Sequence, residues 1–156
     1  MSTKSHTGFT LVEIVIVMGI MVVLMMIGSV NFFPIKQKVS LTTTVSNMIT
    51  DFKQQQLKAM SGKLSTGIYF DPDNKSYVVF EGDTYNPANN SNFRINLGDQ
   101  IETSIIDFSG RQIIFNPLSG EINNYINGNK IALLNTFSKE QKLIYINKYG
   151  IITNVQ

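Results

Sequence analysis

The sequence predicts an α+β protein, with a long N-terminal helix followed by a β-rich globular head. Three observations support this. Residues 14–35 form a run of 22 residues without a charged side chain. Apolar residues then recur at spacings of three and four up to about residue 60, which is the pattern of an amphipathic helix. From residue 63 onward, short runs of β-branched and aromatic residues alternate with turn residues.

The first half of the predicted helix, which as a whole runs from Phe9 to about Met60, is long enough to cross a bilayer. At about 1.5 Å per residue, the uncharged run matches a hydrocarbon core of about 30 Å. Proline inside a helix removes a hydrogen bond, so we expect a bend or local melting between Gly28 and Pro34. The alternative is that Pro34 ends a transmembrane helix and a second helix begins.

The second half, residues 36–62, is predicted to be amphipathic and to lie against the head. Ser61-Gly62 is a plausible end for this helix. The predicted apolar stripe consists of Val45, Met48, Ile49, Phe52, Gln56 and Ala59.

The head, residues 63–156, is predicted to form one or two antiparallel sheets whose apolar face the helix covers. Asp71-Pro72-Asp73-Asn74 is a turn sequence, and Asn127-Gly128 is typical of a hairpin turn. The expected strands are 66–70, 76–80, 93–97, 101–108, 111–116, 121–126, 130–134, 141–147 and 151–155.

Composition excludes several kinds of site. The chain has no cysteine, and its only histidine is His6, so thiolate zinc sites and histidine-based catalytic sites beyond residue 8 are excluded. The carboxylates of the head are scattered and no nucleophile motif is present, so we expect no enzyme, no cofactor and no metal. The oxygen-rich turn Asp71, Asp73 and Asn74 suggests calcium as a rival to a simple turn, but no EF-hand pattern follows it.

Glu13 is a lone carboxylate at the start of the apolar run, and three interpretations are open. It could lie at the interface of an ordinary signal anchor. It could belong to a secretory signal peptide with Lys4 in its charged part, although the apolar run exceeds the usual length of about 7–15 residues. It could also meet a positive charge in another subunit, because a charge within a membrane segment costs about 2.5–3.5 kcal/mol near the helix centre.

The run Gly8-Phe9-Thr10-Leu11-Val12-Glu13 resembles the cleavage and methylation motif of type IV prepilins and type II secretion pseudopilins. The resemblance implies that a prepilin peptidase cuts after Gly8 and N-methylates Phe9. It also implies that Glu13 neutralises the N-terminus of a neighbouring subunit during assembly. Residues 1–8 would then be a leader, 9–35 a transmembrane and filament-core helix half, 36–62 the amphipathic half and 63–156 the head of a pilin-like fold.

The resemblance implies a structural function, that of a minor pilin or pseudopilin that joins or caps a helical filament. Such filaments belong to type IV pili, type II secretion systems or competence systems. The implied partners are prepilin peptidase, other pilin or pseudopilin subunits, the inner-membrane assembly machinery and, before assembly, the lipid bilayer. The implied location is the bacterial inner membrane, crossed once with the N-terminus in the cytoplasm and the head exported, and later a periplasmic or surface filament.

Two segments of the head are similar to a narrower group, the GspH/FimT-like minor pseudopilins. These segments are residues 113–120, which end in Pro117-Leu118-Ser119-Gly120, and residues 143–152, which contain a glycine turn. Some FimT-like pilins bind DNA, so a DNA receptor for uptake is the alternative function. The head has only two arginines, Arg94 and Arg111, and Glu140 interrupts the C-terminal lysines 139, 142 and 148, so a solvated mixed-charge surface is favoured.

Overall fold

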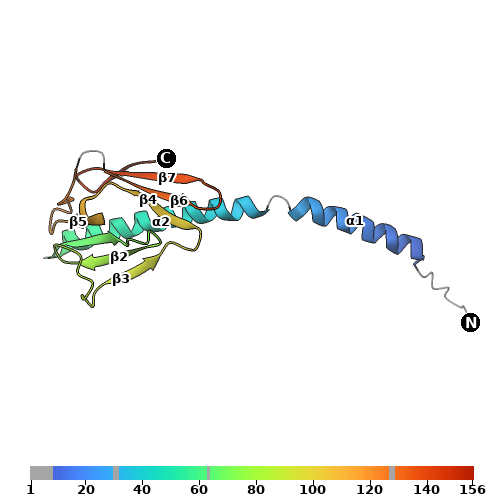
Figure 1. Ribbon diagram of the computed structural model, residues 1–156, viewed down its shortest axis with the longest axis horizontal. Helices are drawn as coiled ribbons and strands as arrows, with labels where there is room; N and C mark the ends of the chain where they lie inside the picture. The colour runs from blue at the N-terminus through green and yellow to red at the C-terminus, as the bar shows by residue number, and fades with distance from the viewer. Residues whose placement is uncertain (1–8, 30–31, 63, 127–128) are drawn as a thin grey trace, which may run out of the picture. The chain divides into compact units, whose positions relative to one another are not determined.

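The computed structural model describes residues 9–29, 32–62, 64–126 and 129–156, with the side chains of residues 27–40 left out. Contacts divide the chain into two compact units, Met1–Lys36 and Gln37–Gln156. Figure 1 shows the elements in order: α1 Leu11–Ser29, α2 Phe32–Ser61, β1 Thr66–Phe70, β2 Ser76–Glu81, β3 Phe93–Asn96, β4 Ile101–Ile106, η1 Ser109–Arg111, β5 Gln112–Phe115, β6 Lys130–Asn135, β7 Gln141–Ile146 and β8 Ile152–Val155.

The single helix expected from Phe9 to Met60 is described as two helices, α1 and α2. Residues 30–31, within the expected bend between Gly28 and Pro34, lie outside the described residues. Pro34 does not end the first helix. It is the third residue of α2, where a missing N–H removes no intrahelical hydrogen bond. Over the part of the chain that the structure describes, no helix meets the length and hydropathy needed to cross a membrane.

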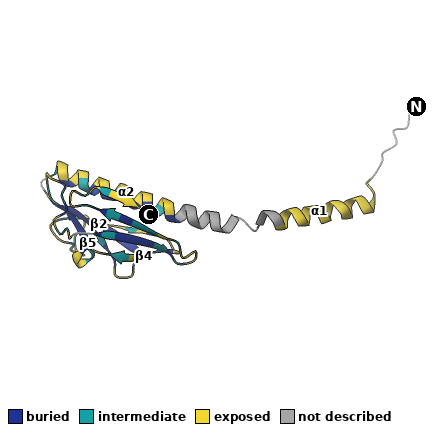
Figure 2. Ribbon diagram, turned by 90° about the horizontal axis from the view of Figure 1, so that it is seen from above, coloured by how far each residue is buried: buried dark blue, intermediate teal, exposed yellow. Residues whose placement is uncertain are grey.

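Helix α2 buries one stripe and exposes the opposite face, as the sequence predicts. Figure 2 shows the two faces of the helix in contrasting colours. The helix ends at Ser61, where the Gly62 amide donates to the Ala59 carbonyl at 3.3 Å. Ile49 and Gln56 are half-buried, and the buried residues are Leu41, Val45, Met48, Phe52, Gln55 and Ala59.

The head contains two four-stranded antiparallel sheets, with strand orders β3-β2-β1-β5 and β4-β6-β7-β8. The predicted strands are confirmed within a few residues at their ends, with one exception. The segment 121–126 is not a strand, and it contributes only one bridge, between Ile122 and Phe115. The hairpin expected at Asn127-Gly128 is wrong, because β6 pairs with β4 and β7 instead; residues 127–128 themselves lie outside the described residues.

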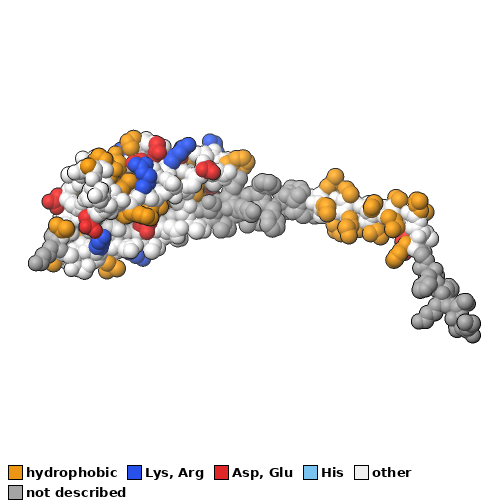
Figure 3. Space-filling model, turned by 90° about the horizontal axis from the view of Figure 1, so that it is seen from below, with side chains coloured by type: hydrophobic (Ala, Val, Ile, Leu, Met, Phe, Trp, Pro, Cys, Tyr) orange, Lys and Arg blue, Asp and Glu red, His pale blue; other side chains and the backbone are white. Residues whose placement is uncertain are grey.

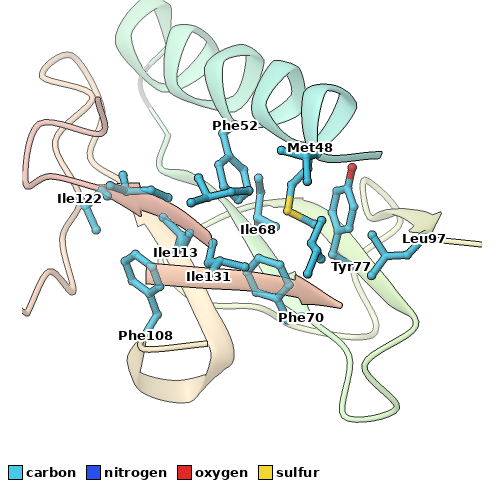
Figure 4. Packing of buried hydrophobic residues seen from close by; sticks show 14 of the residues in the cluster. Met48, Phe52, Ile68, Phe70, Tyr77, Leu97, Phe108, Ile113, Ile122 and Ile131 are labelled. Carbon is cyan, nitrogen blue, oxygen red and sulfur yellow. The ribbon is translucent and has the colours of Figure 1, made fainter. Parts of the chain in front are cut away.

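One hydrophobic cluster joins α2 to both sheets. Met48 and Phe52 of the helix lie over Ile68 and Phe70 of β1 (Figure 4). Phe52 and Phe70 meet edge to face, with ring centroids 6.5 Å apart. The second sheet contributes Ile101, Ile131, Leu133, Ile144 and Ile146 to the same cluster.

The second face of the β3-β2-β1-β5 sheet is covered by the loop that follows β2. Tyr85 of this loop stacks on Tyr69 with centroids 4.0 Å apart and meets the edge of Phe80. Phe80 is buried beside Gly67, its cross-strand partner in β1. The asparagine-rich part of the loop is held by its own side chains, since Asn92 donates to the Asn86 carbonyl at 2.8 Å. Tyr85 and the loop that carries it therefore cover this face of the sheet.

The outer edge of β5 is closed by a side chain instead of a strand. The Asn124 amide group donates to the Gln112 carbonyl at 2.7 Å and accepts from the Ile114 amide at 3.3 Å. The Asn123 backbone amide adds a hydrogen bond to the Ile114 carbonyl at 2.8 Å. Edge strands with unpaired backbone groups are sites of aggregation, and this segment occupies those groups.

Gln56 fastens two turns of the head to α2. Its side-chain nitrogen donates to the Gly120 carbonyl at 3.0 Å and to the Tyr149 carbonyl at 2.6 Å. A third hydrogen bond joins the Leu118 amide to the Ala59 carbonyl at 3.0 Å. These bonds fix the turns that follow β5 and β7 against the last turns of the helix.

Candidate functional site

The candidate site is the start of α1, where Thr10 caps the helix. Phe9 and Thr10 precede the helix, which begins at Leu11. The Thr10 carbonyl accepts the first helical bonds, from the Glu13 amide at 3.1 Å and the Ile14 amide at 3.3 Å. The Thr10 hydroxyl oxygen also accepts from the Glu13 amide, at 3.3 Å. A threonine whose side chain accepts from the third helical amide is an N-cap.

The cap is part of a recognisable sequence pattern, Thr10-Leu11-Val12-Glu13. Threonine followed three residues later by glutamate is a capping-box sequence. Glu13 lies in the first turn of α1, where a negative charge complements the partial positive charge of the helix start. Sequence reasoning assigned Glu13 but overlooked Thr10, although this spacing could have identified it.

The surface of α1 is apolar on every side. Every side chain from Leu11 to Met26 is exposed, and the large hydrophobic ones are 49–80% exposed. Figure 3 shows hydrophobic side chains crowded along this helix. Glu13 is the one charged residue between these two positions. A helix that is apolar all round is normally buried against other apolar groups.

Phe9 and Glu13 share one side of this segment. Both line the same shallow surface, together with Val17 and Met21 further along. Phe9 is 80% exposed and Glu13 is also exposed, so within the described residues nothing covers either side chain. Gly8, the third of the predicted site residues, lies outside the described residues.

Residues 3–29 match a family model described as the prokaryotic N-terminal methylation motif. The chain carries the prepilin-type signature. Comparison with the curated proteins and with the solved structures gave no significant match.

The prepilin-type motif is the signature of type IV prepilins and pseudopilins, and it supports a pilin-like protein. Proteins with this motif are structural subunits, and the motif implies processing by prepilin peptidase and assembly with other pilins. It also suggests anchoring in the inner membrane followed by association with a pilus. The match covers Thr10 and Glu13, so the cap described above lies within the motif.

The oxygen-rich turn of the head is occupied by the protein itself. The Asp71 carboxylate accepts from the Ser76 hydroxyl at 2.6 Å and pairs with Arg94 at 2.8 Å. Asp73 accepts from the Lys75 amide at 3.0 Å, and the Asn74 side-chain oxygen accepts from Arg111. These contacts support the turn interpretation over calcium. No cluster of three or more potential metal ligands occurs among the residues described.

Both arginines that a DNA receptor would need are engaged within the head, and one of the three C-terminal lysines lies near a carboxylate. Arg94 pairs with Asp71, and Arg111 donates to the carbonyls of Phe70 and Asp71. Lys148 lies 3.9 Å from Glu121, which brings a negative charge to the same surface. Phosphate binding requires clustered cations that are free to replace counterions. The head therefore offers little support for DNA binding.

Proposed function

We propose that this chain is a minor pilin or pseudopilin, a subunit that joins or caps a helical filament of a type IV pilus, a type II secretion system or a competence system. The observation that supports this most is the position of the methylation motif over the start of α1. The motif spans the expected cleavage position, the cap and the whole of helix α1. Each of these parts has a use in a subunit that is first held in a membrane and then packed into a filament.

Processing would begin with cleavage after Gly8, which removes eight of the 156 residues and leaves 148. Glycine leaves no side chain to obstruct a peptidase that binds extended backbone. Free α-amines ordinarily have a pKa near 8, so in water at neutral pH the new amine of Phe9 would carry a positive charge. The same enzyme would then methylate this amine.

Glu13 would provide the partner for the Phe9 ammonium of a neighbouring subunit. An isolated charge is costly in an apolar surrounding, and a pair of opposite charges is less so. Since the pair forms only at one axial offset between subunits, it sets the register of assembly more than it adds stability. The exposed position of Glu13 in the first turn of α1 leaves its carboxylate accessible for such a contact.

Before assembly, residues 9–35 would hold the subunit in the inner membrane with the head, residues 63–156, on the exported side. The all-round apolar surface of α1 over Leu11–Met26 supports this placement. Lipid would cover the helix first, and the helices of other subunits would cover it in the filament. Since lipid and the neighbouring helices are both apolar, α1 can pass from one to the other without a polar face.

The first experiment is the intact mass and N-terminal sequence of the chain expressed with and without a prepilin peptidase. We expect loss of residues 1–8 and one added methyl group on Phe9 only when the peptidase is present. A Gly8→Ile variant is the matched control and should remain uncut. A wild-type chain left uncut while a reference prepilin is processed would refute the proposal.

The role of Glu13 needs a separate measurement, because cleavage and assembly are different steps. A Glu13→Gln variant keeps the size and hydrogen-bonding capacity of the side chain but removes its charge. We expect it to be cleaved normally and to fail in filament incorporation, measured by crosslinking to other subunits. Normal incorporation would show that the charge has no part in register.

The proposed place in the GspH/FimT-like group is supported by two turn sequences, one after β5 and one after β7. Gln56 donates a hydrogen bond to each of these turns. The DNA-receptor alternative has no comparable support, since both arginines are engaged in the head. A DNA-binding titration in increasing salt separates the two functions. Micromolar binding that weakens steeply with salt would favour the receptor.

A further inference from the structure

We infer that Thr10 is a positioning residue for processing: its cap fixes the start of α1 so that the Gly8–Phe9 bond stays outside the helix. This inference rests on the proposed function, because it concerns the cleavage and methylation steps. Thr10 would act through the backbone conformation of its own chain, without contacting the peptidase.

The geometry around Thr10 supplies the first step of the argument. The first four amides of a helix have no intrahelical partner, and each needs an acceptor. For the Glu13 amide, Thr10 provides two acceptors, its carbonyl oxygen at 3.1 Å and its hydroxyl oxygen at 3.3 Å. Its carbonyl accepts the first backbone bonds, so Phe9 and Thr10 are the last two residues before the helix. The boundary therefore lies two residues beyond the expected scissile bond.

A fixed helix boundary matters most where the medium around the helix is apolar. An unpartnered amide is costlier in an apolar medium than in water, so the start of a helix there needs an acceptor for its free amides. The sequence offers Thr7, another residue type favoured at N-caps, three positions before Thr10. A helix that began after Thr7 would include both Gly8 and Phe9. Thr10 competes with that start and keeps the bond ahead of the helix.

The cap also affects the amine that cleavage creates. With the helix beginning at Leu11, the Phe9 amine lies one residue before the cap. A positive charge is unfavourable at the start of a helix, where the partial charge is also positive. Keeping Phe9 outside the helix, with Glu13 in the first turn, leaves its amine free to reach the methyl donor.

The test compares three substitutions in the full-length chain, each incubated with purified prepilin peptidase in detergent micelles. Thr10→Val keeps the shape of the side chain and removes the acceptor, whereas Thr10→Ser and Thr10→Asn both retain one. Loss of a cap shifts a helix equilibrium by a factor of about 2 to 30, so we expect kcat/KM for Thr10→Val to fall by that factor. Thr10→Ser and Thr10→Asn should stay within about twofold of wild type.

The split between KM and kcat distinguishes positioning from a general effect on folding. When only a fraction of the substrate is in the competent conformation, its apparent affinity falls by that fraction. The Thr10→Val effect should therefore appear as a raised KM with an unchanged kcat. Hydrogen exchange at the Glu13 amide should be faster in Thr10→Val and restored in Thr10→Asn. Thr43→Val, on the exposed face of α2, is the matched control and should change neither quantity.

Two results would overturn the inference. Equal cleavage of Thr10→Val and wild type would show that the cap has no effect on processing. Slow cleavage of Thr10→Asn together with normal protection of the Glu13 amide would show that the peptidase reads the threonine side chain directly. An uncut wild-type chain is a different outcome, since it would refute the proposed function itself.

Discussion

The phenolic hydroxyl of Tyr77 donates a 2.5 Å hydrogen bond to the Asp51 carboxylate, tying β2 to α2 across 26 positions of the sequence. Tyr77 is 1% exposed, so its ring lies in the core while its hydroxyl reaches the helix. Burial, and then the bond and charge of Asp51, raise the pKa of Tyr77 well above its ordinary value near 10. This contact is one of the polar links that orient the amphipathic helix on the first sheet.

Tyr77→Phe removes this link and leaves a half-buried carboxylate without its tyrosine partner. We expect the free energy of unfolding to fall by about 1–3 kcal/mol, the usual range for an unsatisfied buried group. Urea unfolding of the detergent-solubilised chain, followed by far-UV circular dichroism, measures the change. Asp51→Asn retains an acceptor for the hydroxyl and should be less destabilising. An unchanged midpoint for Tyr77→Phe would show that the bond adds no stability.

The raised pKa of Tyr77 also predicts a loss of stability at alkaline pH. In the folded state the phenol keeps its proton, whereas in the unfolded state it ionises near pH 10. Above that pH the folded state binds more protons, so the contribution present below pH 10 is lost as pH rises. Wild type should therefore lose stability more steeply than Tyr77→Phe between pH 9.5 and pH 11, in matched thermal melts at about 0.5-unit intervals.

Gln56→Glu tests the fastening of the two turns to α2. The side-chain nitrogen of Gln56 donates to the carbonyls of Gly120 and Tyr149, and a carboxylate can donate to neither. We expect a loss of about 2–4 kcal/mol at neutral pH, because two acceptors would face a negative charge. Part of the stability should return below about pH 4, where a protonated glutamate can donate once. Gln54→Glu, on the exposed face of the same helix, should be nearly neutral at both pH values.

Gly67→Ala should be among the most destabilising single-methyl additions in the head. A Cβ at this position would lie 2.6 Å from the Phe80 ring and would also clash with the Ile113 carbonyl oxygen. Both neighbours belong to strands that pair with β1, so neither can move without disturbing the sheet. Overpacking typically costs about 1–3 kcal/mol, and we expect the upper end of that range. Gly19→Ala in α1 is the control, because a Cβ there would meet nothing within 4 Å apart from the neighbouring backbone of its own helix, and it should not lower the melting temperature.

Leu118→Gly should stabilise the head, although it removes a large side chain. Leu118 has a φ of 66° and is 75% exposed, so its side chain adds strain and contributes little packing. The left-handed conformation costs about 1–2 kcal/mol for a residue with a Cβ, part of which the flexibility of glycine offsets. We expect a gain of about 0.5–1 kcal/mol in thermal unfolding. Leu118→Val, which is β-branched, should be less stable than wild type.

The sequence was sufficient to predict most of the head, because its strands are short and alternate with turn residues. The stripe from Val45 to Ala59 also predicted which face of α2 is buried, since its spacing follows the helical period. The segment 121–126 misled the strand prediction. It has strand-like residues, but the bridge from Ile122 to Phe115 and the side chain of Asn124 replace a ladder there. Local composition does not reveal which partner a segment will meet.

The candidate site was predictable in part. The spacing of Gly8, Phe9 and Glu13 indicated the prepilin-type motif, which the family match at residues 3–29 confirms. The sequence did not single out Thr10, because a neutral residue next to an apolar run is less conspicuous than the charged Glu13. The roles of Gly8, Phe9 and Glu13 depend on an enzyme and on neighbouring subunits, so they remain predictions that only those partners can test.

The closure of the β5 edge by Asn124 has a consequence for chemical ageing. Deamidation of asparagine would replace the nitrogen that donates to the Gln112 carbonyl with an oxygen that repels it. Because one amide group occupies both backbone positions, a single slow hydrolysis would open the edge of the sheet. In stored samples we expect a one-dalton mass increase at Asn124 to precede the loss of monomer measured by light scattering.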